Sequence, residues 1–259
     1  MDAVQRFAEL VTGRGRGPDL DVGALAIAAG SDPGLDPEPS LRELDRLAEG
    51  VDSLEGLVQR LFVDNGFTGN SDDYYDPRNS LLPEVLRRRA GIPITLSLVA
   101  IEVGRRAGIA LEGVGMPGYF LFRPIGTEHY LDAFDGGRAL TYEECEQRFR
   151  SSTGAGDDVP FTGRMLATSP TRAILARVLE NLRVAYRNHV QPEDVEWVLR
   201  MRLLLPGVGV EHLLEMGNVL GQQGRWDEGA KFLVEQSDGW PQHAEVLDHA
   251  ARVLLANLN

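Results

Sequence analysis

The sequence is poor in basic residues and in cysteine, and it has no long apolar run. Its 26 Lys and Arg residues are outnumbered by 39 Asp and Glu residues, which gives a formal net charge of −13. Binding to nucleic acid or anionic lipid without specificity requires a basic surface, so we expect no nucleic-acid partner and no membrane partner. A single cysteine, Cys145, excludes an internal disulfide and is typical of a reducing compartment.

No stretch approaches the roughly 18 apolar residues that span a membrane, and the N-terminus lacks the apolar segment of a secretory signal. We therefore expect a soluble, cytoplasmic protein. With 259 residues, of which 43% are hydrophobic and 25% charged, the chain has an ordinary globular composition and room for one or two domains.

The first ninety residues predict helices joined by loops, since apolar residues recur at helical spacing. Ser40 with Glu43 forms a capping-box pattern in front of a helix that begins near Leu41. A later helix, from about Leu81 to Arg89, is expected to end at Gly91, where a positive φ is tolerated.

The middle of the chain changes from one long helix to short β-rich runs. Pro93 suits the first turn of a nearly apolar, buried helix that stops at Gly108. The runs Leu111–Met116, Tyr119–Arg123 and Tyr130–Phe134 follow, and the turns between them predict antiparallel pairing. The fold class is therefore α+β: a helical N-terminal region with a small antiparallel sheet.

Two further local signals lie beside these strands. Gly118 belongs to a Pro-Gly turn, where a positive φ is expected. Thr141 with Glu144 forms a second capping box that opens a helix to about Phe149. The polar, glycine-containing run that follows, residues 151–160, is the best candidate for a domain boundary.

Beyond residue 160 the sequence predicts only helices. When Gly217 is aligned with the tetratricopeptide glycine, the residues at consensus-like positions are Leu213, Leu220, Gly229 and Leu233. Pro206 and Pro241 end two units that are offset by 35 residues. A plain bundle of αα-hairpins stays open as an alternative. Two units are too few to fold alone, so we expect the tail (161–259) to pack against the first domain (1–160).

Three blocks stand in order in the middle of the chain, namely Tyr74–Ser97, Gly113–Arg123 and Tyr130–Gly137. Together they resemble the signature of the SirB-type transglutaminase-like family, and Asn181–Tyr186 extends the likeness into the tail. The resemblance covers most of the chain and implies a transglutaminase-like, cysteine-protease-like core. In active relatives of this kind, a cysteine at a helix N-terminus is the nucleophile. A histidine on a neighbouring strand is the base, and a carboxylate one strand further orients the histidine.

The resemblance implies a degenerate triad in this chain. Pro93 occupies the nucleophile position, and proline has no side-chain nucleophile. Tyr119 occupies the histidine position, and an ordinary tyrosine, with a pKa of about 10, is a poor base at neutral pH. Asp132 matches the carboxylate. These three residues do not support acyl transfer by the cysteine mechanism, and Asp132 alternatively serves as a turn residue bonded to backbone amides.

Other residues that carry reactive groups have simpler interpretations. Thr95 and Ser97 are hydroxyl nucleophiles in principle, but no histidine is matched to their neighbourhood. We expect them to bond first-turn amides or to pack in the core. His129 is expected at the surface, and Cys145 is expected to be a half-buried packing residue.

No metal or cofactor site is indicated. The remaining histidines, all in the tail, lack metal-ligand spacing; they are His189, His212, His243 and His249. The aspartates Asp72, Asp73 and Asp76 lack the spacing and the final glutamate of a calcium loop, so we expect a solvated loop. A Cys-x-x-Cys pair, a phosphate loop and a dinucleotide fingerprint are all missing from the sequence.

The function we expect is that of a non-catalytic, regulatory protein that binds a peptide or protein segment in the old catalytic cleft. Two alternatives stay open. One is an amide hydrolase or acyl transferase of altered chemistry, using a pocket around Asp132 and Tyr119. The other is a structural scaffold that assembles through the helical repeats. The sequence names neither the partner nor the oligomeric state.

Overall fold

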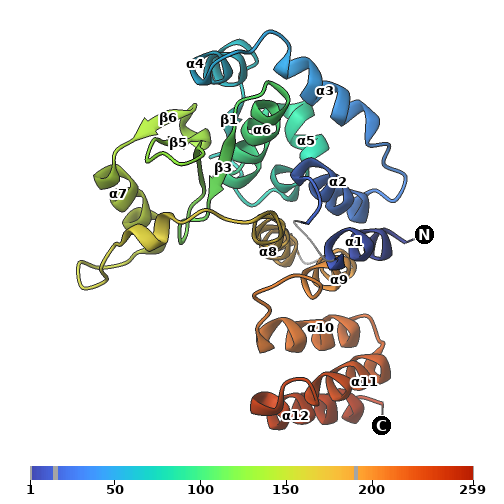
Figure 1. The fold of residues 1–259 in the computed structure, drawn as a ribbon. Coiled ribbons are helices and arrows are strands. Elements are labelled where there is room, and N and C mark those ends of the chain that lie inside the picture. Colours follow the sequence, from blue (N-terminus) through green and yellow to red (C-terminus); the bar gives the residue numbers. More distant parts are fainter. Residues whose placement is uncertain (1, 14–16, 190–191, 259) are drawn as a thin grey trace.

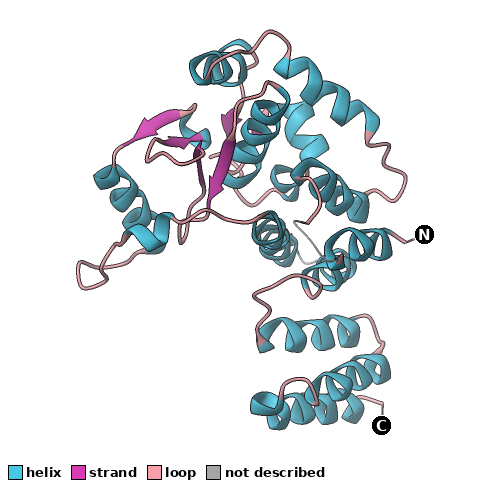
Figure 2. Cartoon of the chain, viewed as in Figure 1, coloured by secondary structure: helices cyan, strands magenta, loops and turns pink. Residues whose placement is uncertain are grey.

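The computed structural model describes residues 2–13, 17–189 and 192–258. Helices dominate the chain, and the strands gather on one side of the central helix α6 (Figures 1 and 2). The N-terminal helices are α1 (Ala3–Thr12), α2 (Leu20–Ser31), α3 (Glu38–Ala48), α4 (Leu54–Val58) and α5 (Leu82–Arg88). A π-helical turn (Gln59–Asp64) continues α4, and a 3-10 turn (Pro77–Ser80) precedes α5.

The starts of these helices test the capping patterns. Ser53 caps the start of α4, because its hydroxyl accepts the Gly56 N–H at 3.1 Å. The capping box predicted at Ser40 is wrong, since α3 begins at Glu38, directly after Pro37, and Ser40 lies inside the helix. Helix α2 has no clear amphipathic pattern, because its residues are almost all apolar and many are buried.

Helix α6 (Pro93–Arg106) is buried over nearly its whole length, as predicted. Its side chains include Leu96, Leu98 and Val99, each at most 1% exposed. Burying one such side chain contributes about 1.5–3 kcal/mol. The N-terminal helices, the sheet and the tail all contribute to the main hydrophobic core around this helix.

The described residues form a four-stranded antiparallel sheet in the order β3-β4-β5-β6. Its strands are β3 (Leu111–Val114), β4 (Leu121–Pro124), β5 (Tyr130–Asp132) and β6 (Arg138–Leu140). The first three confirm the predicted runs, although each is shorter than predicted. Strand β6 has only three residues, which is too short to give a sequence signal.

Two glycines near the sheet behave differently from each other. Gly118 has a φ of +73°, as predicted for a Pro-Gly turn. The prediction that Gly91 ends a helix is wrong: Arg89 takes the left-handed conformation after α5, with a φ of +58°. Gly91 lies instead in β2 (Ala90–Gly91), which pairs in parallel with β1 (Thr68–Gly69). A Cβ at Gly91 would lie 2.8 Å from the Thr95 hydroxyl, so close packing is what requires glycine there.

Helix α7 (Tyr142–Thr153) follows the sheet, and Thr141 with Glu144 caps it as predicted. The tail then consists of α8 (Thr171–His189), α9 (Pro192–Arg202), α10 (Val210–Gln222), α11 (Trp226–Ser237) and α12 (Ala244–Ala256). Figure 1 shows α10, α11 and α12 stacked away from the sheet, whereas α8 lies next to it. Within the described ranges, no helix combines the length and the apolar character needed to cross a bilayer.

The junction between α2 and the tail depends on small residues. A Cβ added at Gly23 would lie 2.5 Å from Leu175 of α8, and one added at Gly30 would lie 2.3 Å from the Trp197 ring of α9. Glycine therefore allows α8 and α9 to pack directly on α2. The main core includes buried residues of both helices, and the division of the chain near residue 160 stays a prediction.

We predict that Gly30→Ala lowers the free energy of unfolding by about 1–3 kcal/mol, because the added methyl group overlaps the Trp197 ring. In a helix without this contact, replacing glycine by alanine would stabilise the protein by about 1 kcal/mol. A decrease in the free energy of unfolding would therefore report the steric conflict alone. Urea titration followed by circular dichroism measures the change. Gly34→Ala is the control, since its nearest neighbour would lie at an ordinary 3.5 Å. Equal stability of both variants would contradict the proposed close approach.

Glu43 of α3 joins two parts of the N-terminal region by ion pairs. It contacts Arg46 at 2.8 Å and also pairs with Arg89, which follows α5. Arg46, with Arg89, lowers the pKa of Glu43 to about 2, against a smaller opposing effect of burial. The ionised carboxylate therefore stabilises the fold fully above its ordinary pKa of 4.5, and this contribution is lost as the pH falls toward 2.

We predict that Glu43→Gln destabilises the protein by about 1–2 kcal/mol at pH 7. The difference from the wild type should shrink as the pH is lowered from 5 to 3. Thermal melts across this range measure both effects. Glu84→Gln, which removes a more exposed pair with Arg87, should change stability by less than about 0.5 kcal/mol. A difference that does not vary with pH would refute the linkage.

Candidate functional site

Pro93 is the first residue of α6, and its surroundings fix where the helix begins. The Ile92 N–H donates to the Thr95 hydroxyl at 3.2 Å, and that hydroxyl lies 2.6 Å from the Asn79 carbonyl, to which it donates. Proline needs no amide partner at this position, so the turn is complete without a polar side chain at residue 93.

Tyr119 and Asp132 lie in direct contact. Tyr119 follows the Pro117-Gly118 turn, and its N–H donates to the Met116 carbonyl at 3.0 Å. Its hydroxyl lies 3.1 Å from each carboxylate oxygen of Asp132, which ends β5 and is fully buried. Pro93 and Tyr119 line the same small cavity. The three positions of the predicted triad therefore converge.

The sequence did not indicate that Arg148 would complete this cluster. Arg148 comes from α7, and its Nη2 lies 2.7 Å from Asp132 Oδ2. Its guanidinium also lies 5.0 Å from the centre of the Tyr119 ring, a cation–π distance. Asp132 Oδ1 accepts the N–H groups of Phe134 and Asp135, at 3.0 and 3.3 Å. The expected alternative for Asp132, a turn residue bonded to amides, matches these contacts.

Burial dominates the protonation of this cluster. It raises the pKa of Tyr119 far above its ordinary value, and the negative charge of Asp132 raises it further. The phenol therefore stays protonated and acts as a hydrogen-bond donor, since no accessible pH converts it to a base. Burial also raises the pKa of Asp132, although Arg148 and the hydrogen bond from Tyr119 oppose the shift.

Two adjoining cavities lie between the start of α6 and α8. The smaller, of about 40 Å³, is lined by Pro93 and Tyr119 together with Arg177 and Asn181 of α8. The larger, of about 230 Å³, lies beside it, and both share Tyr74, Ile92 and Asn181 in their lining. We refer to the two cavities together as the α6–α8 cleft. The smaller one has room for only a few atoms beside the triad positions.

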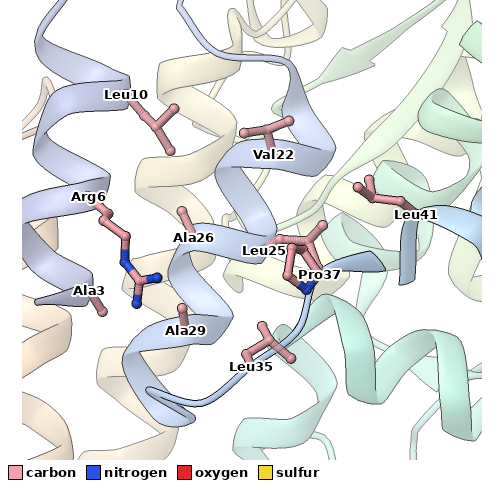
Figure 3. A pocket seen from close by; sticks show the side chains of 10 residues that line it. All are labelled: Ala3, Arg6, Leu10, Val22, Leu25, Ala26, Ala29, Leu35, Pro37 and Leu41. Carbon is pink, nitrogen blue, oxygen red and sulfur yellow. The ribbon is translucent and has the colours of Figure 1, made fainter. Parts of the chain in front are cut away.

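A separate groove of about 230 Å³ lies between α1, α2 and the segment that leads to α3 (Figure 3). Its lining is mostly aliphatic, and the charged side chain at its edge is Arg6. No acid, base or nucleophile converges among the lining residues, so the groove offers no catalytic chemistry. The α6–α8 cleft is therefore the better candidate site.

A family model described as the transglutaminase-like superfamily matches residues 35–180. The chain belongs to this superfamily. The match includes all three triad positions and Arg148, and it ends within α8. The convergence of Pro93, Tyr119 and Asp132 agrees with the arrangement that the family resemblance of the sequence implies. No solved structure is significantly similar to the chain.

Curated relatives are similar to different parts of the chain. A UPF0162 protein of Xylella fastidiosa (strain Temecula1) is 47% identical over 132 residues, which cover 49% of this chain and 47% of the relative. A UPF0162 protein of Pseudomonas aeruginosa is 36% identical over 177 residues, which cover 64% of each chain. Human F-box only protein 21 is 27% identical over 258 residues, or 95% of this chain and 38% of that protein. The chain thus spans about half the length of the first of these superfamily relatives.

The other reactive residues lie outside the triad cluster. The Thr95 hydroxyl is hydrogen-bonded to the backbone at the start of α6. Ser97 is fully buried, and its hydroxyl has no hydrogen-bond partner among the described residues. His129 is exposed, as expected. Cys145 is fully buried, not half-buried, because it packs under the sheet. Burial raises the pKa of its thiol to about 11, so it is not a thiolate at neutral pH.

In the described ranges, no group of three or more His, Cys, Asp or Glu side chains has the geometry of a metal site. Asp72 and Asp73 are exposed, as expected of a solvated loop, but Asp76 is buried. Asp76 forms ion pairs with Arg78 at 2.7 Å and with Arg88 at 3.3 Å, which explains its burial. His212 hydrogen-bonds the Glu180 carboxylate at 3.1 Å, while the side chain of His189 lies outside the described residues.

We predict that Tyr119→Phe lowers the free energy of unfolding by about 1–3 kcal/mol, since it removes a hydrogen bond from a buried carboxylate. Tyr142→Phe is the matched control, because the Tyr142 hydroxyl makes one bond of 3.3 Å at an exposed position. It should change stability by less than about 0.5 kcal/mol. Chemical denaturation measures both variants. If Tyr119→Phe is as stable as the wild type, the Tyr119 hydroxyl does not hold the turn before β4 to Asp132 of β5.

Proposed function

We propose that this protein is a non-catalytic, regulatory member of the transglutaminase-like superfamily that binds a peptide or protein segment in the α6–α8 cleft. The observation that carries the proposal is the state of Asp132. Its carboxylate is held by the Tyr119 hydroxyl and by Arg148, while the nucleophile position is Pro93. Each group that would drive acyl transfer is replaced or occupied by a structural contact.

The relatives support a binding role in a limited way. The region similar to this chain makes up 38% of human F-box only protein 21. The same unit is therefore joined to other segments there, as is common for binding modules. The name UPF0162 protein states no activity.

We further propose that the tail is tetratricopeptide-like and that the family is the SirB type. Helices α10 and α11 pack closely, since a Cβ at Gly217 would lie 2.7 Å from Leu233, and one at Gly229 would lie 2.8 Å from the Gly217 carbonyl. Leu213, Leu220 and Leu233 are all buried, as the repeat pattern predicts. Such a tail would offer a second binding surface beside the cleft. The reducing compartment suggested by Cys145 supports a cytoplasmic location.

The proposal predicts no turnover of amide substrates. The wild type should neither incorporate a fluorescent primary amine into a glutamine-containing peptide nor hydrolyse a chromogenic peptide amide. An active transglutaminase serves as the positive control in the same buffers. Product that the wild type forms and that Asp132→Ala or Tyr119→Phe abolishes, while both variants remain folded by circular dichroism, would establish an enzyme of altered chemistry in place of a binding module.

A further inference from the structure

Arg177 of α8 is a half-buried cation that forms no ion pair with the described residues. Its Nη1 donates to the Met116 carbonyl at 2.8 Å, and its guanidinium lies 5.7 Å from the centre of the Phe120 ring. Among the described residues, no carboxylate forms an ion pair with it, and its Nε and Nη2 have no hydrogen-bond partner there. Both of these nitrogens therefore escape full burial, and Arg177 is one of the residues that line the smaller cavity.

Three other partly buried arginines of this chain are paired with carboxylates, whereas Arg60 and Arg172 donate to backbone carbonyls. Arg148 contacts Asp132, Arg106 contacts Asp21, and Arg183 contacts both Glu180 and Glu215. Partial removal of a guanidinium from water without an acidic partner is unfavourable, and burial accordingly lowers the pKa of Arg177. Arg177 therefore differs from these arginines in retaining its capacity to bind an anion.

The side chains around Arg177 are suited to a peptide. Asn181 lies one turn further along α8, lines both cavities and makes no side-chain hydrogen bond to the described residues. Tyr74 and Tyr75 line the larger cavity and are 39% and 53% exposed, with their rings in edge contact at 5.4 Å. Tyrosine and arginine are enriched at the energetically important points of protein interfaces.

The sizes of the two cavities indicate how a ligand would be divided between them. A volume of about 40 Å³ beside Arg177 accommodates a group little larger than one water molecule, such as a carboxylate. The adjoining 230 Å³ accommodates a neighbouring side chain against Tyr74 and Tyr75. The planar guanidinium and the amide of Asn181 supply donors on the same side of α8, which suits a planar anion.

We propose that Arg177 and Asn181 bind a carboxylate of an acidic peptide segment that lies across Tyr74 and Tyr75. This inference rests on the proposed binding function of the α6–α8 cleft and names its ligand class. We assign the carboxylate to the side chain of an internal Asp or Glu, with a neighbouring side chain of the segment in the larger cavity.

The test uses an array of acetylated and amidated hexapeptides of varied sequence, with each Asp or Glu peptide placed beside its Asn or Gln counterpart. We expect the full-length protein to bind a subset of acidic peptides at least tenfold more tightly than their amide counterparts. Arg177→Gln should abolish this preference. Arg187→Gln, which removes an exposed arginine of the same helix, should retain it.

The outcomes separate this inference from the proposed function. Equal binding of acidic and amide peptides overturns the carboxylate site and leaves peptide binding intact, whereas no binding on the array counts against both. Binding of only those peptides that have a free C-terminus, included as a separate set, also overturns the assignment to an internal acid.

Two further measurements test the geometry of the site and its selectivity among anions. If Arg177→Gln does not fold, the paired peptides on the wild type still decide the question. Arg177→Lys then tests the planar geometry and should weaken acidic peptides about tenfold or more. Acetate should compete with bound peptide at least as well as inorganic phosphate does, and displacement by phosphate at clearly lower concentration would show a general anion site.

Discussion

The rest of the structure depends on one constraint, which is that the apolar helix α6 has to be buried. Its sequence is apolar around most of its circumference, so no orientation of the helix is tolerated at a surface. The N-terminal helices cover one part, the antiparallel sheet covers another, and α8 contributes to the same core. The first turn of α6 is consequently fixed in space, and the residues of two neighbouring strands are brought to it.

The same arrangement gives Asp132 a structural role at the positions where the family resemblance implies a catalytic triad. The carboxylate that would orient a histidine is present at the end of β5, but it now links three segments mechanically. Tyr119 attaches the turn before β4, Arg148 attaches α7, and two backbone amides attach the turn that follows β5. A buried carboxylate that is bonded on all sides contributes to specificity of folding, and it is no longer free to serve a base.

Most of the local patterns in the sequence predicted the structure correctly, although the capping box at Ser40 did not. The central helix, the first three strands and the capping box at Thr141 follow from periodicity and turn residues, and the convergence of Pro93, Tyr119 and Asp132 follows from the family resemblance. The contact of Arg148 with Asp132 and the position of Arg177 in the cleft could not be predicted in this way. Each arginine lies on a helix whose sequence pattern does not indicate which residues the arginine will contact. The prediction that Gly91 ends a helix is wrong for a related reason. Glycine is required there by the close approach of the Thr95 side chain, and such a contact produces no periodic pattern in the sequence. Arg89, a non-glycine residue, took the left-handed position instead.

Helix α8 has a mechanical consequence. It is one uninterrupted helix of 19 residues, about 28 Å long. It lines the cleft through Arg177 and packs against the next tail helix, α9. Gly23 and Gly30 let the backbone of α2 lie directly against the side chains of α8 and α9. Because this contact is closely packed, α2, α8 and α9 have little freedom to move relative to one another. A displacement of α9 would therefore also displace α8, whose middle part, from Arg177 to Ala185, lines the cleft.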